Sequence, residues 1–503
     1  MSSDRIDPKF SALPLAAMAD AALTRAREFG AEHADLRVER IGSQSIDLRD
    51  GAVTGVTDDT TVGLAVRVVV DGVWGFASHV ELTPVRAAAT AERAVTVART
   101  LAPVAIERVA RVDEPVHPGA VWVSTCMVDP FTVPTRDKVE LLTEWSQRLL
   151  STDGVDHVRA GVEQVRENKF YADLAGTSTL QERVRIAPSF TATAVDRATG
   201  GFETMKSLAP PVGRGWEYLT GDGWDWDGEL ARVPELLAEK TRAPTVAAGV
   251  YDLVIDPTNL WLTLHESVGH ATEYDRAIGY EAAYAGTSFA TPDLLGSLRY
   301  GSEHMHVTGD RTVRHGLATI GFDDDGVATT EWDLVRDGVL VGYQVDRTFA
   351  PRLGLDRSNG CAFADSPHHV PIQRMANVSL RPDPVRDTST EELIAGIDRG
   401  IYVVGDKSWS IDMQRYNFQF TGQRFFRIRN GALAGQLRDV AYQATTTDFW
   451  GSLDAVGGAS TWQLHGTMNC GKAQPAQVAA ASHGCPSARF RGVTVLNTLQ
   501  EGR

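Results

Sequence analysis

The stretch DPTNLWLTLHESVGH, residues 256–270, decides how the rest of this sequence is interpreted. Asp256 is a favourable N-cap and Pro257 a favourable first helical residue, so a helix is predicted to begin here, directly after a strand. Apolar residues then recur at helical spacing, which places one face of this helix in a core. These residues are Leu260, Trp261, Leu264 and Val268. His265 and Glu266 are therefore expected on a buried or cleft-lining helix.

The two histidines of this stretch, His265 and His270, are five positions apart. In the familiar zinc-protease helix the histidines are four positions apart and lie close to one face. At about 100° per residue, five steps leave the two rings roughly 140° apart on an ideal helix. The pair can share one metal only if the last turn widens, bulges or ends, and Gly269 permits such a break. The alternative is two unrelated histidines on an amphipathic helix.

The length, charge and cysteine content of the chain limit the functions that it can have. With 503 residues it can form two to four domains of ordinary size. Its formal net charge of −16 argues against a nucleic-acid partner, which requires a basic face. We find neither the apolar segment of a signal peptide near the start nor an apolar run long enough for a membrane span. Four cysteines in so long a chain do not form a disulfide framework, so we expect a cytoplasmic protein whose thiols can bind metals.

The pattern of apolar residues and turn signals predicts an α+β fold with two domains. Residues 1–242 are expected to form a layered helix and antiparallel-sheet domain, in which the units 1–102 and 134–242 are joined by a proline-rich, irregular connector. Residues 243–503 are expected to form a strand-rich domain that carries the histidine helix. The clearest elements are helices at 14–29, 84–101, 135–150 and 227–239, separate strands at 34–39 and 45–48, and hairpins that turn at Asp71-Gly72, Asp337-Gly338 and Asn430-Gly431.

A third metal ligand is needed beside the two histidines. Zinc prefers nitrogen and sulfur, and a catalytic zinc site uses three protein ligands and a water. On chemistry alone two residues are equal candidates: Cys470, in a predicted glycine-containing turn, and Glu273, one helical turn after His270. His483 and Cys485 rank behind them. The alternative for each cysteine is a small buried apolar residue, which is the commoner fate of a free thiol.

Several short motifs together resemble those of a known family. The segment His265-Glu-Ser-Val-Gly-His270-Ala-Thr-Glu273-Tyr-Asp275 is similar to the signature of the TldD/PmbA family of cytoplasmic metallopeptidases. The segments at 373–377 (QRMAN), 469–472 (NCGK) and 482–486 (SHGCP) agree with it. The His-Glu-x-x-x-His string is typical of the catalytic, TldD-like members, whereas PmbA- or TldE-like members lack it. The chain therefore resembles the catalytic type.

The resemblance also implies site residues and a cofactor. It implies one zinc ion per active site, held by His265, His270 and Cys470, which decides between the two candidates for the third ligand. Glu266 matches the catalytic glutamate, which would act as general base. Glu273 and Asp275 are then expected to support the ligands from behind.

The implied activity is hydrolysis of peptide bonds in unfolded or short peptides, bound as an added strand. The implied partner is a PmbA- or TldE-like subunit in a heterodimer, or a second copy in a homodimer. One alternative is a non-catalytic, metal-stabilised binding or assembly subunit. A structural zinc is normally closed by four protein ligands, so the number of ligands separates these two hypotheses. Another alternative is metal-assisted hydrolysis of a substrate that is not a peptide.

Overall fold

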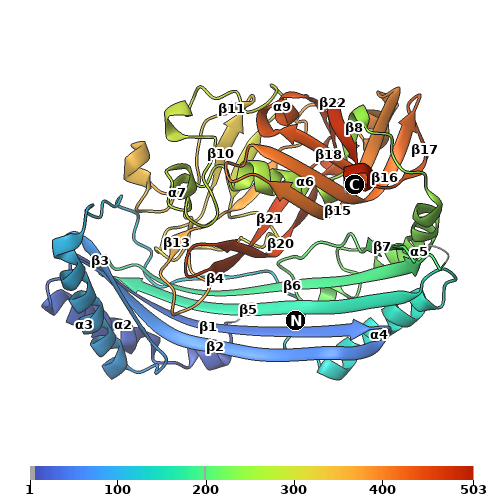
Figure 1. Cartoon of the computed structure of the whole chain (residues 1–503). Helices are drawn as coiled ribbons and strands as arrows, with labels where there is room; N and C mark the ends of the chain where they lie inside the picture. The colour runs from blue at the N-terminus through green and yellow to red at the C-terminus, as the bar shows by residue number, and fades with distance from the viewer. Residues whose placement is uncertain (1–5, 198–199, 502–503) are drawn as a thin grey trace.

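The computed structural model describes residues 6–197 and 200–501. The outermost residues of the two predicted domains, 1–5 and 502–503, lie outside the described residues, as do residues 198–199. The fold is α+β, as predicted: one long, curved sheet forms the N-terminal part, and a strand-rich C-terminal part lies against its concave face (Figure 1). The division between residues 242 and 243 stays a prediction.

The N-terminal sheet has seven strands in the order β3-β2-β1-β5-β6-β4, and β7 pairs with β6. Strands from both predicted units lie in this one sheet, because β1 pairs with β5 along most of its length. The strands are β1 (His33–Arg49), β2 (Ala52–Val70), β3 (Val73–His79), β4 (Ala120–Val123), β5 (His157–Asp173), β6 (Ser178–Val195) and β7 (Phe202–Lys206).

Two local expectations for this part were wrong. Residues 34–39 and 45–48 belong to one continuous strand, β1, because residues 41–44 pair with β2 on one side and with β5 on the other. The connector is not wholly irregular, since its strand β4 pairs in parallel with β6. In both places pairing with distant strands outweighs a local sequence that is weakly strand-forming.

The predicted helices of this part are present: Figure 1 shows α2 and α3 on the convex face near one end of the sheet, α4 on that face near the other end, and α5 beside this second end. Thr83 caps α3, where its hydroxyl accepts from the N–H of Arg86. Ala34, Leu36 and Val38 alternate along β1 and pack in the same core as α2 and α3. The helices of this part are α1 (Pro8–Ser11), α2 (Leu15–Glu28), α3 (Pro84–Leu101), α4 (Thr135–Leu150), α5 (Trp226–Arg242), and the short 3₁₀ helices η1 (Ala102–Val104) and η2 (Trp216–Tyr218).

The C-terminal part is built around a second seven-stranded sheet, in the order β15-β8-β22-β18-β16-β17, and β19 pairs with β22. Because β15 also pairs with β16, five of these strands close into a ring. The strands are β8 (Gly249–Ile255), β15 (Arg399–Ile411), β16 (Asn417–Arg429), β17 (Ala432–Leu437), β18 (Val440–Thr445), β19 (Leu453–Val456) and β22 (Ala488–Asn497).

Smaller elements surround this ring. A four-stranded sheet holds β11, β10, β9 and β14, while β12 pairs with β13 and β20 pairs with β21. The remaining strands are β9 (Val307–Asp310), β10 (Glu331–Arg336), β11 (Val339–Leu340), β12 (Ala362–Phe363), β13 (Ile372–Gln373), β14 (Asn377–Leu380), β20 (Gln463–Lys472) and β21 (Gln477–Cys485). The helices are α6 (Pro257–Leu264), η3 (His265–Gly269), α7 (Tyr274–Ala277), η4 (Pro292–Leu294), η5 (Ala350–Leu353), α8 (Thr390–Ala395), α9 (Thr446–Gly451), η6 (Ala459–Thr461) and α10 (Thr498–Glu501).

A buried layer of charged side chains joins the two parts. The side chains on the concave face of the N-terminal sheet are polar where those on the convex face are apolar. Lys169 Nζ lies 2.8 Å from Asp324 Oδ2, and Arg67 pairs with Asp325. Within the N-terminal sheet, Arg183 and Arg185 both pair with Glu167, at 2.6 and 2.8 Å.

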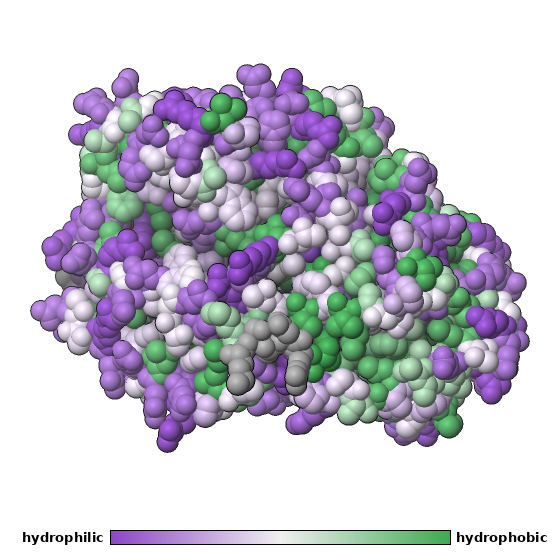
Figure 2. Space-filling view, turned by 180° about the vertical axis from the view of Figure 1, so that it is seen from behind, coloured by the Kyte–Doolittle hydropathy of each residue, from purple (hydrophilic) through white to green (hydrophobic). Residues whose placement is uncertain are grey.

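The surface seen from behind is uneven in hydropathy. Figure 2 shows that apolar side chains gather at the lower right of this face, on the side where α2 and α3 lie in Figure 1. Exposed apolar residues near the ends of α3 include Val85, Val104 and Ile106. Among the described residues, no helix combines the length and the apolar character needed to cross a membrane.

Candidate metal centre

The histidine helix begins as the sequence predicts and then changes its winding. Asp256 caps α6 by accepting from the N–H of Thr258 at 3.1 Å. After Leu264 the chain forms a π-helical turn, η3, in which the N–H of His270 donates to the carbonyl of His265 at 2.9 Å. A π turn brings residues five positions apart onto one face. The expected widening is therefore confirmed, and the two imidazole centroids lie 4.7 Å apart.

Contacts from other elements hold this wide turn. Gln344 Nε2 donates to the carbonyl of Gly269 at 2.7 Å, and Trp450 Nε1 donates to Ser267 Oγ at 3.0 Å. Gly269 itself packs closely against Met375, and a Cβ added there would lie 2.7 Å from the Met375 sulfur. A larger residue at this position would therefore have to displace the flexible end of the Met375 side chain.

Cys470 completes a group of three possible metal ligands. Its Sγ lies 3.5 Å from His270 Nε2, and the ligand atoms of His265, His270 and Cys470 all lie within 4.8 Å of one another. All three side chains are buried. The expectation that Cys470 lies in a turn was wrong, because it lies on strand β20, paired with Ala479 of β21. The glycine beside Cys470 suggests a turn at that position, but the strand continues to Lys472 and the turn begins only after it.

The other candidates for the third ligand lie outside this group. Cys485 lies at the far end of β21, opposite Gln463, and burial raises its pKa. Glu273 is not one of the three candidate ligands but contacts one of them, since its Oε2 lies 2.8 Å from His270 Nδ1. His483 does the same for the other histidine, with its Nε2 2.7 Å from His265 Nδ1.

These contacts assign the protons of the two rings. His483 Nδ1 lies 2.8 Å from the carbonyl of Val378, which can only accept, so that nitrogen carries the proton. Its Nε2 then accepts from His265 Nδ1, and the Glu273 carboxylate accepts from His270 Nδ1 in the same way. Both histidines are left with a free lone pair on Nε2, which is the form that a metal requires. Burial lowers the pKa of both rings, which favours this neutral form.

Charged residues behind the centre fix Glu273 in its ionised form. Arg276 Nε and Lys472 Nζ lie 3.1 and 3.2 Å from its two oxygens, and Lys472 also pairs with Asp275 at 2.7 Å. Burial opposes ionisation, but Lys472 and His270 outweigh it and hold the pKa of Glu273 well below its usual value. Glu273 and Asp275 thus lie behind the ligands, as the resemblance implies.

The thiol of Cys470 is inclined to ionise. Burial opposes its ionisation, but the His270 ring in its protonated form and the Arg374 guanidinium outweigh burial, so the pKa of Cys470 lies below its usual value. Two neutral imidazoles and one acidic thiol form a donor set that suits zinc. The residues present therefore fit a metal of this kind.

Glu266 lies on the same π turn and has a partner that the sequence did not indicate. Arg415 Nη1 lies 2.7 Å from Glu266 Oε2, while Arg415 Nη2 donates to the carbonyl of Ala285 at 3.1 Å. The other oxygen of Glu266, Oε1, has no hydrogen-bond partner among the described residues. Arg415 lies in the tight turn between β15 and β16 with a positive φ of 63°. No local motif in the sequence links this arginine to a residue so far back in the chain.

Two ring nitrogens and a thiol that lie close together in a strand-rich α+β protein form a candidate metal site. Comparison with known proteins gives the family. Residues 248–497 match the PmbA/TldA metallopeptidase C-terminal domain, and residues 34–101 match the PmbA/TldA metallopeptidase domain 1. Together these matches cover more than half of the chain, and the chain belongs to the PmbA/TldD family of metallopeptidases.

Similar proteins agree with this assignment. A metalloprotease of Methanothermobacter thermautotrophicus is 29% identical over 471 residues, which cover 93% of this chain and 96% of that protein. A zinc metalloprotease TldD homolog of Saccharolobus solfataricus is 25% identical over 47% of this chain and 50% of that protein. The solved structure of TldE from Thermococcus kodakarensis has the same fold, with a TM-score of 0.71 and 16% identity over 95% of this chain and 99% of that chain.

Proposed function

We propose that this protein is a zinc-dependent peptidase of the catalytic, TldD-like type, which hydrolyses peptide bonds in unfolded or short peptides in the cytoplasm. The observation that carries the proposal is the convergence of His265, His270 and Cys470 within 4.8 Å, beside Glu266 on the same π turn. The names of the similar metalloproteases support the class of reaction.

The residues of the centre would divide the work between binding and proton transfer. His265, His270 and Cys470 would hold one zinc ion, which when bound lowers the pKa of a water and polarises a carbonyl. Glu266 would take a proton from the attacking water through its free Oε1 and later give it to the leaving amine. Arg415 would hold the other oxygen and so fix the direction of the carboxylate.

The three-ligand arrangement supports catalysis over the alternative, a non-catalytic subunit with a structural metal. A closed structural site needs a fourth protein ligand. Among the described residues, Cys485 and His483 do not belong to the group of candidate ligands, and His483 Nε2 is already used by His265. One coordination position would therefore stay open for water or substrate.

Strand β20 is the edge at which we propose that the peptide adds as a strand. It carries Cys470 and, in the part of the chain that the structure describes, pairs with β21 alone. Main-chain hydrogen bonds at such an edge bind peptides with little dependence on sequence. For assembly we propose a PmbA- or TldE-like partner or a second copy, in line with the apolar surface in Figure 2.

Elemental analysis combined with digestion of a denatured protein tests the proposal. We expect about one zinc per chain in wild type and in Glu266→Gln, whereas the variant should lose about 10²- to 10⁴-fold in turnover. Wild-type turnover in a zinc-loaded Glu266→Gln protein would exclude the general-base role. Absence of any cleavage by the zinc-loaded wild type, alone and with a PmbA-like subunit, would favour the non-catalytic alternative.

A further inference from the structure

A cavity of about 470 Å³ lies between the N-terminal sheet and the C-terminal part, and we call it the acidic cavity. Its volume is in the range of small-molecule and side-chain binding sites. Arg67 and Trp74 line it from the N-terminal sheet, and the C-terminal part supplies most of the rest. Four carboxylates line it against this one arginine: Asp275, Glu281, Asp325 and Asp346.

Two of these four carboxylates are already neutralised. Asp325 pairs with Arg67, and Asp275 pairs with Lys472. Glu281 and Asp346 have no ion-pair partner within 4.0 Å among the described residues, although the two residues are only 7% and 6% exposed. Each accepts backbone hydrogen bonds, Glu281 from Ala473 and Asp346 from Thr348 and Phe349. A buried carboxylate without a cation is costly, so a cation that enters this cavity would be bound strongly.

The other walls of the cavity suit a cation on an apolar stem. Tyr280, Tyr284 and Phe349 line it together with Val370, Pro371 and Ile372. Aromatic faces attract guanidinium and ammonium groups, and methylene groups pack well against such walls. Arg352 already lies over Tyr280 and Phe349 from one side, at 5.9 and 5.6 Å.

The acidic cavity shares its walls with the metal centre. Asp275 lines the cavity and is bonded to Lys472, which also contacts the Glu273 that orients His270. The loop that supplies Tyr280 to Tyr284 continues to Ala285, whose carbonyl accepts from Arg415, the partner of Glu266. A group bound in the cavity would therefore lie close to a peptide bond held at the centre.

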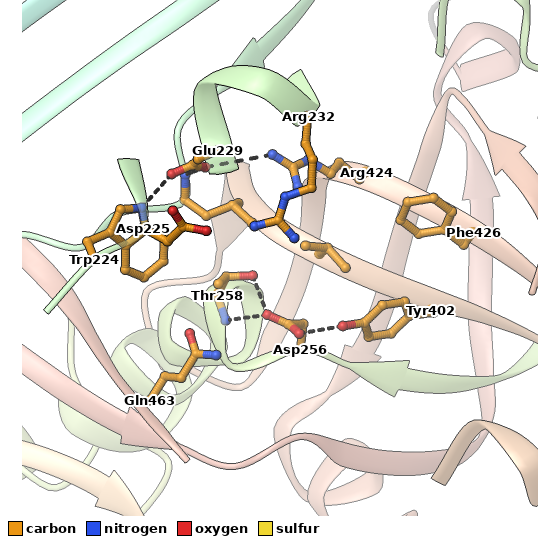
Figure 3. Close-up of a pocket in the computed structure, with 12 residues that line it drawn as sticks. Trp224, Asp225, Glu229, Arg232, Asp256, Thr258, Tyr402, Arg424, Phe426 and Gln463 are labelled. Atoms are coloured by element: carbon orange, nitrogen blue, oxygen red, sulfur yellow. Dashed lines mark hydrogen bonds and ion pairs between the residues drawn. The ribbon is translucent and has the colours of Figure 1, made fainter. Parts of the chain in front are cut away.

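A second cavity, of about 360 Å³, lies at the start of α6, whereas the metal centre follows the end of this helix (Figure 3). Its charged residues differ from those of the acidic cavity. Its carboxylates already accept internal hydrogen bonds: Asp256 from Thr258 and Tyr402, and Glu229 from Trp224. Arg232 and Arg424 line it as well. Three carboxylates therefore line this cavity together with two arginines, whereas four carboxylates and one arginine line the acidic cavity.

We propose that the acidic cavity binds the side chain of a lysine or arginine of the peptide substrate, near the bond that is cleaved. The protein would then be selective for basic peptides. This inference rests on the proposed peptidase function, and the experiment below separates the two.

The test compares two peptides that differ only in arginine against citrulline, which has the same shape without the charge. We expect wild type to cleave the arginine peptide with a kcat/KM about 10- to 100-fold higher, as for one buried charge-assisted contact. Glu281→Gln and Asp346→Asn keep the shape and the acceptor oxygen, and each should reduce this preference to less than about threefold. Glu144→Gln, an exposed acid on α4, is the matched control and should keep the wild-type preference.

Calorimetric titration with butylguanidine, and with neutral butylurea as its control, measures the same site without turnover. We expect butylguanidine alone to bind, and both cavity variants to weaken it about 10-fold or more. Equal cleavage of the two peptides, or butylguanidine binding that neither variant weakens, would overturn the inference. If no peptide is cleaved, the peptidase proposal fails, and the titration alone decides whether this is a cation site. If Glu281→Gln does not fold, Asp346→Asn decides both measurements.

Discussion

The charged layer between the two parts of the molecule and the metal centre both bury ionisable side chains, but they pair them differently. In the charged layer, cations and carboxylates neutralise one another directly: Glu167 accepts from Arg183 and Arg185 and lies 3.1 Å from Lys169. At the metal centre, Nδ1 of His265 and Nδ1 of His270 are each hydrogen-bonded to a neighbouring side chain. The Nε2 atoms of both rings keep a free lone pair and lie near the thiol of Cys470. Side chains that neutralise one another form a structural joint, whereas ring nitrogens that keep a lone pair are left as donors for a metal.

The largest effect is expected from removing a donor at the metal centre. His270→Ala or Cys470→Ala should reduce bound zinc from about one per chain to a small fraction and lower peptidase activity more than about 10³-fold, because two ligands rarely retain zinc. Elemental analysis and a peptide assay measure both. Cys485→Ala is the matched control and should keep zinc and activity, and loss of zinc in that variant would show that the wrong thiol has been assigned.

The charged layer should respond in stability instead. Glu167→Gln leaves Lys169, Arg183 and Arg185 without their shared carboxylate and should cost about 3–5 kcal/mol in the free energy of unfolding. Denaturant unfolding monitored by circular dichroism checks this. Zinc content at 25 °C should not change, and a variant that lost zinc while keeping its stability would break the distinction between the two regions.

A smaller effect is expected for the residue that positions Glu266. Arg415→Met removes the contact with Glu266 Oε2 and should lower kcat about 10-fold, while KM and zinc content stay near wild type. The reason is that the Glu266 carboxylate would stay beside the metal site but would no longer be held in one orientation. Arg415→Lys should recover part of the loss. A change confined to KM would assign Arg415 to substrate binding instead.

The smallest effect concerns pH and the acidic cavity. Burial and the nearby Asp325 raise the pKa of Asp346 to about 7, so between about pH 4 and 7 the folded protein holds a proton that the unfolded chain has released. Stability contributed by this group is therefore present at low pH and is lost as pH rises through about 7, with a slope of at most about 1.4 kcal/mol per pH unit. Unfolding of wild type and Asp346→Asn across this range should converge at low pH and diverge as pH rises. Parallel curves would contradict it.

Much of the fold could be predicted from local signals. The helix start at Asp256 and Pro257, the cap at Thr83 and the turn at Asp71-Gly72 depend on residues a few positions apart, and each lies where expected. The continuous strand β1 could not be predicted, because residues 41–44 are held by β2 and β5 and not by their own propensity. Cys470 was similarly expected in a turn, because the glycine beside it suggests one, although β21 holds it in a strand.

The sequence by itself determined the buried helix, the two histidines and the acid on it, and the glycine within the turn that widens. Only the tertiary structure decided that the thiol of Cys470 reaches His270, that His483 and Glu273 hold the two rings, and that Arg415 holds Glu266. The physical reason is distance along the chain. Helix starts, caps and turns arise from interactions within a few residues, whereas Cys470 and His270 are 200 positions apart and meet only because strands and a helix pack in one arrangement.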